Sequence, residues 1–384
     1  MLEGSDMIYL DNGATSFPKP AESMGAMLGC MSQYCGNPGR SGHYMSMKTG
    51  EEVYHSRRKI AGLFNIDQAE RLVFTKNTTE ALNLGMTGLL KSGDHVVTTS
   101  MEHNSVLRPL KTLEKRGVEH TIVKGDERGR VSASKIMEAV RPDTRMIVMT
   151  AASNVTGTKM PLKEVGKIAA EKHIIFLVDG AQAAGSSVID VEAMHIDMLA
   201  VPGHKGLLGP LGTGALYVRD GLALSPLLAG GTGTESKSRL QPKDFPEGFE
   251  AGTINAPGII ALGCSVAFVE KIGPEVIGKY EEELIACLEE DLRNMSHIHL
   301  YGPEPSEKTG ICLLNCDGTG AEELTALLSD EFGIAVRGGY HCAGLAHKTI
   351  GTWQTGAVRV SVGPYNTKRD MKALAEALWK VRKR

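Results

Sequence analysis

Two neighbouring apolar segments each end on a side chain that can do chemistry. The run 174–178 is followed directly by Asp179, and the run 198–201 leads into the segment 202–206, which carries Lys205. Because the carboxyl ends of parallel strands meet at one edge of a sheet, we expect the two side chains to lie together. An Asp there is also typical of a strand-end cap or a metal ligand. Lys205 favours a third interpretation, an aldehyde cofactor joined to the lysine with its ring nitrogen paired to Asp179.

A phosphate site is indicated where the apolar run 72–75 enters a helix. The connecting residues are Lys76-Asn77-Thr78-Thr79-Glu80. Free N–H groups and the positive end of the helix attract a dianion, and the hydroxyls of Thr78 and Thr79 add donors. Asn or Thr ahead of Glu is also an ordinary helix cap. The glycines form neither a Walker-type nor a dinucleotide-binding motif, so a nucleotide is not indicated.

A glycine-rich loop, 337–344, follows another predicted strand and carries Cys342 beside His341. A neighbouring histidine can favour the thiolate, which makes Cys342 a candidate nucleophile, although a lone cysteine is more often a packing residue. Arg359 lies on the run 357–362. A guanidinium on a strand that faces a pocket suits recognition of a carboxylate, whereas its alternative role is a surface ion pair.

The elements that must position these residues alternate between strands and amphipathic helices from about residue 71 to 219. Helices are predicted over stretches such as 79–90, 105–116 and 162–172. This pattern predicts an α/β domain with a mostly parallel sheet. Its strands are expected at 72–75, 95–99, 120–123, 146–150, 174–178, 198–201 and 215–218.

A second, smaller α/β domain is predicted after a polar surface loop at 230–253. Its expected helices are 256–271, 274–294, 322–332 and 368–383, and its expected strands are 298–301, 311–315, 335–337 and 357–362. We therefore divide the chain into a large domain, 14–258, and a small C-terminal domain, 259–384, joined by the N-terminal segment 1–13.

Composition excludes several classes of protein. The 384 residues carry a net charge of −3 with 42% hydrophobic residues, and no stretch is apolar enough to span a membrane. We expect a cytoplasmic protein without nucleic-acid or membrane partners, and Met7 as a plausible start after an added segment, 1–6. The seven cysteines show no zinc-type spacing, so no metal is expected. Cys312 and Cys316 are expected on one face of a strand, in the core.

Several segments together resemble the class V aminotransferase superfamily and, within it, the cysteine desulfurase and selenocysteine lyase family. They occur in the same order as in that family and cover nearly the whole chain. The resemblance implies the fold type I of pyridoxal 5'-phosphate (PLP) enzymes, with a seven-stranded, mostly parallel sheet in the large domain. The segments are 9–15, 78–80, 101–104, 153–157, 178–182, 203–205, 249–253 and 337–343.

The resemblance assigns roles around the cofactor. Lys205 would be the Schiff-base lysine, Asp179 would keep the pyridine nitrogen protonated, and Gln182 would hydrogen-bond the phenolic oxygen. His103 would stack on the ring, and Asn154 would meet the same oxygen or the substrate.

The resemblance also implies contacts to the phosphate and to the substrate. His204 and Thr79 would contact the phosphate, as would Thr253 from the other subunit, which implies a homodimer. Asn12, Asn154 and Arg359 would bind the substrate. One position departs from the family: Pro202 stands where a Ser or Thr usually contacts the phosphate, and it has neither a hydroxyl nor an N–H group.

The reaction implied is the conversion of L-cysteine to L-alanine, with the sulfur carried as a persulfide on Cys342. Cys342 precedes Arg359 by 17 residues, which resembles the shorter loop of group II desulfurases, and such enzymes often pass sulfur to an acceptor protein. The alternatives are a class V aminotransferase or selenocysteine lyase, and a low-turnover PLP-binding sulfur carrier or regulatory protein.

Overall fold

A seven-stranded sheet forms the centre of the computed structural model, which describes residues 7–39 and 41–381. The strand order is β2-β8-β7-β6-β5-β3-β4, and within this sheet β8 alone runs antiparallel to its neighbours. The predicted mostly parallel sheet is confirmed, and each predicted strand end lies within two residues of the observed one. The strands are β2 (Leu72–Thr75), β3 (His95–Thr99), β4 (Glu119–Val123), β5 (Thr144–Thr150), β6 (Ile175–Asp179), β7 (Met198–Pro202) and β8 (Gly214–Val218).

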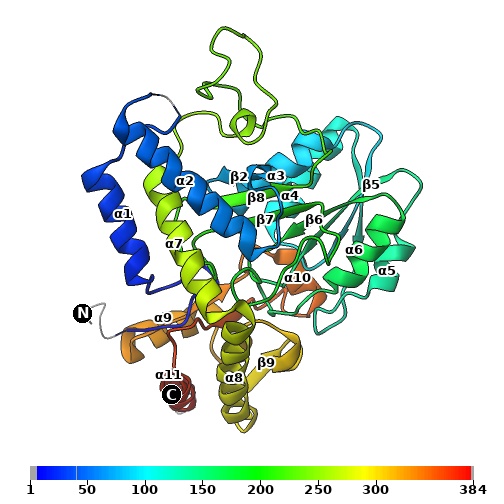
Figure 1. Ribbon diagram of the computed structural model, residues 1–384. Coiled ribbons are helices and arrows are strands. Elements are labelled where there is room, and N and C mark those ends of the chain that lie inside the picture. Colours follow the sequence, from blue (N-terminus) through cyan, green and yellow to red (C-terminus); the bar gives the residue numbers. More distant parts are fainter. Residues whose placement is uncertain (1–6, 40, 382–384) are drawn as a thin grey trace.

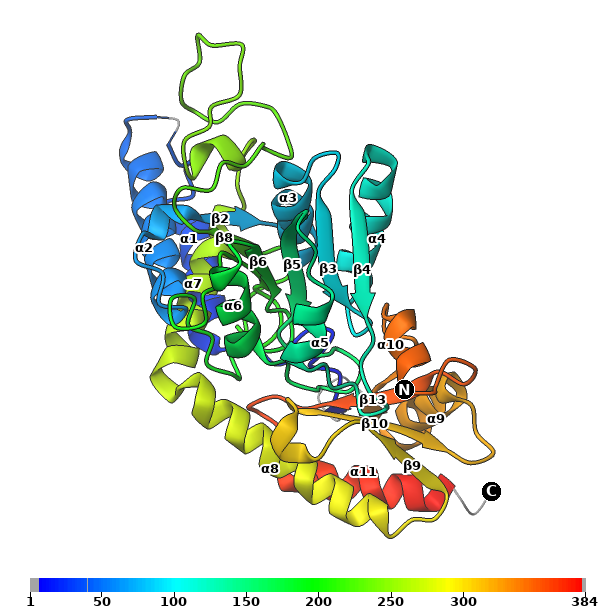
Figure 2. The same cartoon turned by 90° about the vertical axis from the view of Figure 1, so that its right-hand side faces the viewer.

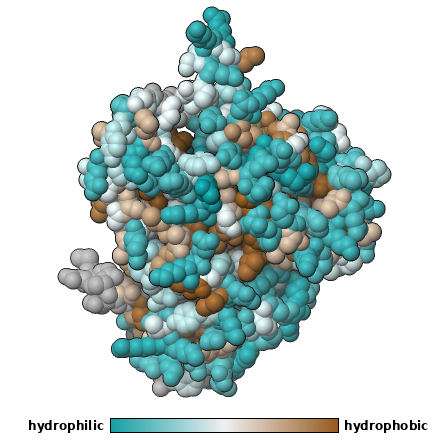
Figure 3. Space-filling view, in the orientation of Figure 1, coloured by the Kyte–Doolittle hydropathy of each residue, from teal (hydrophilic) through white to brown (hydrophobic). Residues whose placement is uncertain are grey.

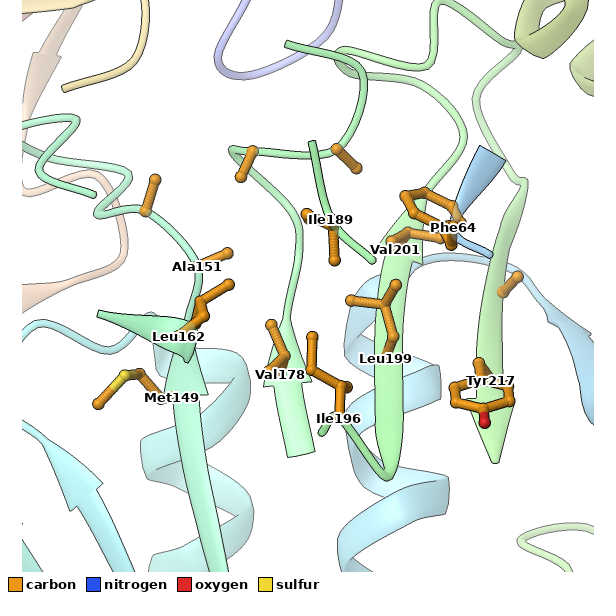
Figure 4. Packing of buried hydrophobic residues seen from close by; sticks show 14 of the residues in the cluster. Phe64, Met149, Ala151, Leu162, Val178, Ile189, Ile196, Leu199, Val201 and Tyr217 are labelled. Carbon is orange, nitrogen blue, oxygen red and sulfur yellow. The ribbon is translucent and has the colours of Figure 1, made fainter. Parts of the chain in front are cut away.

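The central strands are buried on both faces, which explains why they read as continuous apolar runs. Alternate residues enter separate cores: Met146 and Leu177 pack beneath α3 (Thr78–Leu89) and α4 (Asn104–Leu113), on one face. Met149, Val178 and Leu199 point to the other face, as Figure 4 shows. There α6 (Leu162–Glu171) and α5 (Ala133–Glu138) cover the sheet (Figure 2).

Three helices form a layer beside the β2 edge of the sheet (Figure 1). They are α1 (Ala21–Gln33), α2 (Tyr44–Leu63) and α7 (Ala256–Ile272). The sequence analysis assigned no elements to α1 and α2. Gly25, Gly29 and Gly50 lie inside these helices and weaken their helical signal, so tertiary packing against α7 decides their conformation.

The C-terminal part forms a second layer below the large sheet (Figure 2). Its antiparallel sheet has the order β12-β13-β10-β9, and α8 (Pro274–Arg293) and α11 (Lys368–Val381) lie on its outer side, while α9 (Ala321–Phe332) packs near β12. Cys312 and Cys316 are buried in this core, as predicted. The strands are β9 (Ile298–Tyr301), β10 (Ile311–Cys316), β12 (Arg337–Gly339) and β13 (Ala357–Ser361).

Two expectations for the C-terminal part need adjustment. The single strand expected at 335–337 is two short strands, because β11 (Ile334–Ala335) pairs with β1 (Ile8–Tyr9) while β12 joins the other sheet. The closing helix is observed to Val381, and residues 382–384 lie outside the described residues. The pairing of β1 with β11 attaches the N-terminal segment to the C-terminal part.

The division of the chain at residues 258 and 259 falls inside α7. Ile259, Leu262 and Val266 share a core with α1, α2 and one face of the large sheet. The domain division therefore stays a proposal, and the packing of α7 favours a boundary at Gly273, between α7 and α8.

The polar loop predicted at 230–253 is observed, with a single helical turn at Glu247–Phe249. It projects at the top of Figure 1, and Figure 3 shows mainly hydrophilic residues on the projection. Its base is fixed by Glu250, which pairs with Nη1 and Nη2 of Arg57 at 2.7 and 2.9 Å and accepts the Phe74 N–H at 2.7 Å.

Candidate active site

Five strand ends deliver polar residues to one edge of the large sheet, because β2, β3, β5, β6 and β7 run in the same direction. The segments that follow them surround a cavity of about 290 Å³. The predicted residues that line it are Thr78, Thr79, His103, Asn154, Asp179, Gln182, His204, Lys205 and Arg359. The expected meeting of Asp179 and Lys205 at this edge is thus observed.

Lys205 lies in a tight turn after β7. Gly203 makes the turn possible, because a Cβ atom there would lie 2.0 Å from Thr213 Oγ1. The N-terminal segment holds the turn from outside, since the His204 carbonyl accepts hydrogen bonds from Ser16 N at 2.9 Å and Lys19 Nζ at 3.1 Å. Burial and the charge of Arg359 lower the pKa of Lys205 to about 8. About a tenth of the amine is therefore neutral at pH 7, far more than for an ordinary lysine.

Asp179 is buried at the end of β6, with 2% of its surface exposed. Its Oδ1 accepts the Ala181 N–H at 2.9 Å. Burial raises the pKa of this carboxyl, while the hydrogen bond and the charge of Lys205 oppose the rise. A carboxylate withdrawn from water in this way is stabilised by a cation placed beside it in the cavity.

The N-terminus of α3 forms one end of the cavity. Asn77 Oδ1 accepts the Glu80 N–H at 3.0 Å, and the Glu80 carboxylate accepts the Lys76 N–H at 2.6 Å, so the capping interpretation of this segment is observed. The cap leaves the Thr78 hydroxyl buried without a hydrogen-bond partner in the cavity wall. Capping and anion binding are therefore compatible here, since the Thr78 hydroxyl in the cavity wall is not used by the cap.

His103 caps α4 and presents one ring nitrogen to the cavity. Its Nδ1 accepts the Ser105 N–H at 3.0 Å and lies 2.7 Å from Ser105 Oγ, which in turn lies 2.8 Å from Thr79 Oγ1. Burial and the charge of Lys205 lower the pKa of His103 to about 4. The ring is therefore neutral, and because Nδ1 accepts, its proton is on Nε2. Ser105, for which no role was predicted, links His103 to Thr79 at the N-terminus of α3.

Two arginines face the cavity from adjacent strands. Arg337 and Arg359 are direct cross-strand partners, so their side chains lie on the same face of the sheet. Arg359 is 1% exposed; its Nη2 pairs with Asp11 Oδ1 at 2.8 Å, its Nη1 donates to the Asn154 carbonyl at 2.9 Å, and only its buried Nε lacks a partner. Within the described residues, no carboxylate forms an ion pair with Arg337. Arg337 and Asp11 lie within the motifs of the family resemblance, and no role was predicted for either.

The loop that carries Cys342 is anchored to the cavity wall through its backbone. Asn154 Nδ2 donates to the His341 carbonyl at 2.7 Å, and the Asn104 N–H donates to the Cys342 carbonyl at 2.8 Å. His341 and Cys342 have φ angles of 52° and 57°, a left-handed conformation that costs non-glycine residues about 1–3 kcal/mol each. The Cys342 thiol is exposed.

His341 was expected to favour the thiolate of Cys342, but its side chain makes other contacts. Its Nε2 donates to the Arg337 carbonyl at 3.0 Å and its Nδ1 lies 3.2 Å from His347 Nε2. Burial lowers the pKa of His341 to about 3, so the ring is neutral. With both nitrogens engaged inside the protein, His341 fixes the loop and is not placed to hold the proton of the neighbouring thiol.

Three predicted residues are placed differently from the rest. Asn12 does not line the cavity: its amide donates to Ser361 O and Asn366 Oδ1 and accepts the Phe17 N–H, so it joins the N-terminal segment to the C-terminal part. Gln182 lines the cavity, but its Nε2 already donates to Gly13 O at 3.0 Å. Thr253 is exposed and outside this chain's own cavity. Their ligand contacts stay predictions.

The cavity matches the chemical groups of PLP. Four buried polar atoms without a hydrogen-bond partner belong to cavity residues: Thr78 Oγ1, Asn154 Oδ1, His204 Nδ1 and Arg359 Nε. Thr78 and His204 can donate to a phosphate, Asp179 can pair with a ring-nitrogen cation, and Lys205 can hold an aldehyde. Pro202 lines the cavity and adds no donor, as expected. Among the described residues, no group of three or more His, Cys, Asp or Glu side chains could hold a metal ion.

Comparisons with known proteins place this architecture in a family. The family model for class V aminotransferases matches residues 8–374, and the chain belongs to this PLP-dependent family. A probable cysteine desulfurase from Methanothermobacter thermautotrophicus is 37% identical, over 98% of this chain and 95% of the relative. The resemblance stated from the sequence motifs is thereby confirmed.

Solved structures give the same result. The apo cysteine desulfurase of Thermococcus onnurineus NA1 superposes with a TM-score of 0.93 at 34% identity, covering 99% of this chain and 95% of the other. The cysteine desulfurase CsdA of Escherichia coli superposes with a TM-score of 0.88 at 27% identity, covering 99% of this chain and 96% of CsdA. The fold predicted for the chain is therefore confirmed.

No single helix among residues 7–39 and 41–381 is long and apolar enough to cross a membrane. The pair α7 and α8 meets the criterion of length and composition only when both helices are taken together, and they are bent by 75°.

Proposed function

We propose that this chain is a PLP-dependent cysteine desulfurase, which converts L-cysteine to L-alanine and takes up the sulfur on Cys342. The observation that carries the proposal is one cavity that joins Lys205, the buried Asp179 and unpartnered buried donors beneath an anchored loop with an exposed cysteine. Relatives named cysteine desulfurases, similar over the whole chain, support it. Bound PLP would supply the electron sink that lets a proton leave the α-carbon of an amino acid.

In this proposal, each cavity residue has a defined task. Lys205 Nζ holds the cofactor, Asp179 keeps its ring nitrogen charged, and Thr78, Thr79 and His204 bind the phosphate. His103 lies against the ring and offers Nε2–H as a donor. Asn154 Oδ1, buried without a partner, accepts from the substrate or from a protonated ring oxygen.

The substrate carboxylate and the α-proton are handled by different groups. A guanidinium binds the α-carboxylate and fixes the amino acid in the cavity. The amine of the substrate displaces Lys205 from the cofactor. The freed amine of Lys205, with a pKa of about 8, then accepts the α-proton and later returns it.

Sulfur transfer is the task of Cys342. Its thiolate attacks the sulfur of the substrate, so an S–S bond forms as the C–S bond breaks. The electron pair of the C–S bond remains with the substrate carbon, which takes up a proton and becomes the methyl group of alanine. The carbon is reduced and the transferred sulfur is oxidised, so no external oxidant is required. Cys342 has a left-handed backbone conformation and is exposed, so it is accessible for this step.

A homodimer and an acceptor protein complete the proposal. Thr253 follows the projecting loop and is exposed, so it is available to the phosphate site of a second copy. An exposed persulfide on Cys342 is accessible to an acceptor protein. A monomer in light scattering that nevertheless binds a full equivalent of PLP would contradict the shared site.

The proposed reaction is tested by supplying the purified protein with a panel of amino acids and measuring sulfide, alanine and keto acid. We expect alanine from cysteine, and an equal amount of sulfide when a thiol reductant is present. Keto acid as the main product would identify an aminotransferase instead. Activity limited to selenocysteine would identify a selenocysteine lyase, and turnover that stops after one equivalent would identify a sulfur carrier.

The two arginines are expected to differ when each is replaced by alanine. Arg337→Ala removes a guanidinium that has no ion-pair partner among the described residues, so we expect a lower kcat/KM for cysteine, by about 10- to 150-fold, with little change in Tm. Arg359→Ala also leaves Asp11 without its ion-pair partner, so it should lower both kcat/KM and Tm. Steady-state kinetics and thermal melts of the two variants measure these effects. An unchanged kcat/KM for cysteine in Arg337→Ala would mean that Arg359 binds the substrate carboxylate without Arg337.

A further inference from the structure

Glu102 is a buried carboxyl group beside the candidate cofactor site, and the reaction proposed above does not use it. It lies between β3 and α4, directly before His103, and its exposed fraction is 0%. Oε1 lies 2.6 Å from Thr99 Oγ1, and Oε2 is buried without a hydrogen-bond partner. A group so placed needs an explanation, because an ionised carboxylate away from water is costly.

The surroundings of Glu102 supply a second carboxyl group and no cation in contact. The Thr99 side chain comes from β3, and the backbone of Thr150, at the end of β5, donates to the carboxyl. Thr150 pairs in register with Asp179 on β6, and the charge of Asp179 acts on Glu102. Within the described part of the chain, no Lys, Arg or His forms an ion pair with Glu102. The charged group that faces it is therefore an acid.

We propose that Glu102 is a positioning residue that stays protonated in the folded protein, so that the pair Glu102 and Asp179 carries one negative charge, on Asp179, to match one ring-nitrogen cation. Asp179 takes the charge because the Ala181 N–H and the charge of Lys205 stabilise its carboxylate. The Thr99 hydroxyl donates to Glu102 Oε1 at 2.6 Å, and the proton of the neutral carboxyl is assigned to Oε2, which accepts no hydrogen bond. Burial raises the pKa of Glu102 to about 8, which agrees with this assignment.

The first test is the Tm of the holoenzyme and of Glu102→Gln between about pH 5 and 8. A glutamate with a pKa of about 8 when folded and near 4.5 when unfolded binds more protons in the folded state in this range. It therefore destabilises the wild type progressively as the pH rises. The glutamine cannot titrate, so the Tm of Glu102→Gln should gain several degrees relative to wild type over the range. A constant difference, or one that falls with pH, would overturn the proposal.

Glu281 on α8 offers a matched control. It is also buried, and burial raises its pKa to about 8 as well, but the charge that acts on it is that of Lys159 and not that of Asp179. Glu281→Gln should therefore reproduce the Tm trend. Above about pH 8, however, the visible absorbance of bound PLP should change in wild type and Glu281→Gln and not in Glu102→Gln, because Glu102, and not Glu281, is coupled to Asp179, the proposed partner of the ring nitrogen. The same absorbance profile in all three proteins would contradict a positioning role.

A second measurement covers the case in which Glu102→Gln does not fold. In Glu281→Gln at neutral pH, infrared spectroscopy should still detect a protonated carboxyl group, and its band should disappear above about pH 8. Absence of the band at neutral pH would mean that Glu102 is ionised. The inference rests on the proposed function for its cofactor, but none of these readouts needs turnover. Failure of the desulfurase assay and failure of this proposal are therefore separate results.

Discussion

Lys205→Ala is expected to fold and to lose both covalently held PLP and turnover. Lys205 is the cavity lysine next to Asp179, and its pKa of about 8 suits a group that holds an aldehyde and then moves the α-proton. Loss of a general base alone costs about 10²–10⁴-fold in rate, and loss of the covalent attachment adds to this. Turnover should therefore fall below detection.

Borohydride reduction followed by peptide mass mapping measures the attachment directly. Wild-type protein should carry reduced PLP on the peptide that contains Lys205, and Lys205→Ala should carry none. Lys91→Ala, at an exposed lysine away from the cavity, is the matched control and should behave as wild type. PLP trapped on another lysine together with residual turnover would reject the role assigned to Lys205.

Cys342→Ser is expected to keep PLP and to lose sulfur transfer. Cys342 is outside the set of cavity residues that hold the cofactor, so the visible spectrum should be that of wild type. The variant lacks the nucleophile that reacts only in the sulfur-transfer step, so alanine and sulfide formation should fall by about two orders of magnitude or more.

The persulfide provides the direct readout. Wild-type protein given cysteine without reductant should gain about 32 Da, one sulfur atom, on the peptide with Cys342. Cys35→Ser is the matched control, because Cys35 is the other exposed cysteine among the described residues, and it should gain the same mass. Sulfide release at the wild-type rate by Cys342→Ser would mean that the cysteine of this loop does not carry the reaction.

The sequence by itself determined the framework of the site. The apolar runs that end at Asp179 and before Lys205 are parallel strands, and strands buried on both faces of a sheet read as short continuous apolar runs. Parallel strands with helical connections bring their carboxyl ends to one edge, so local pattern was sufficient to predict which residues meet. The capped start of α3 was readable for the same reason, because a helix cap is a contact within a few residues.

Only the tertiary structure decided how the cavity is charged. Asp11 and Arg359 are 348 residues apart in the chain and pair because β13 and the N-terminal segment lie side by side. The cross-strand register places Arg337 beside Arg359, where it has no ion-pair partner within the described part of the chain. Asn12 is engaged by Ser361 and Asn366. Burial, which sets the protonation of Glu102 and His103, is a property of everything packed around a group. Neither the pairing of distant segments nor the exclusion of water is encoded in local spacing.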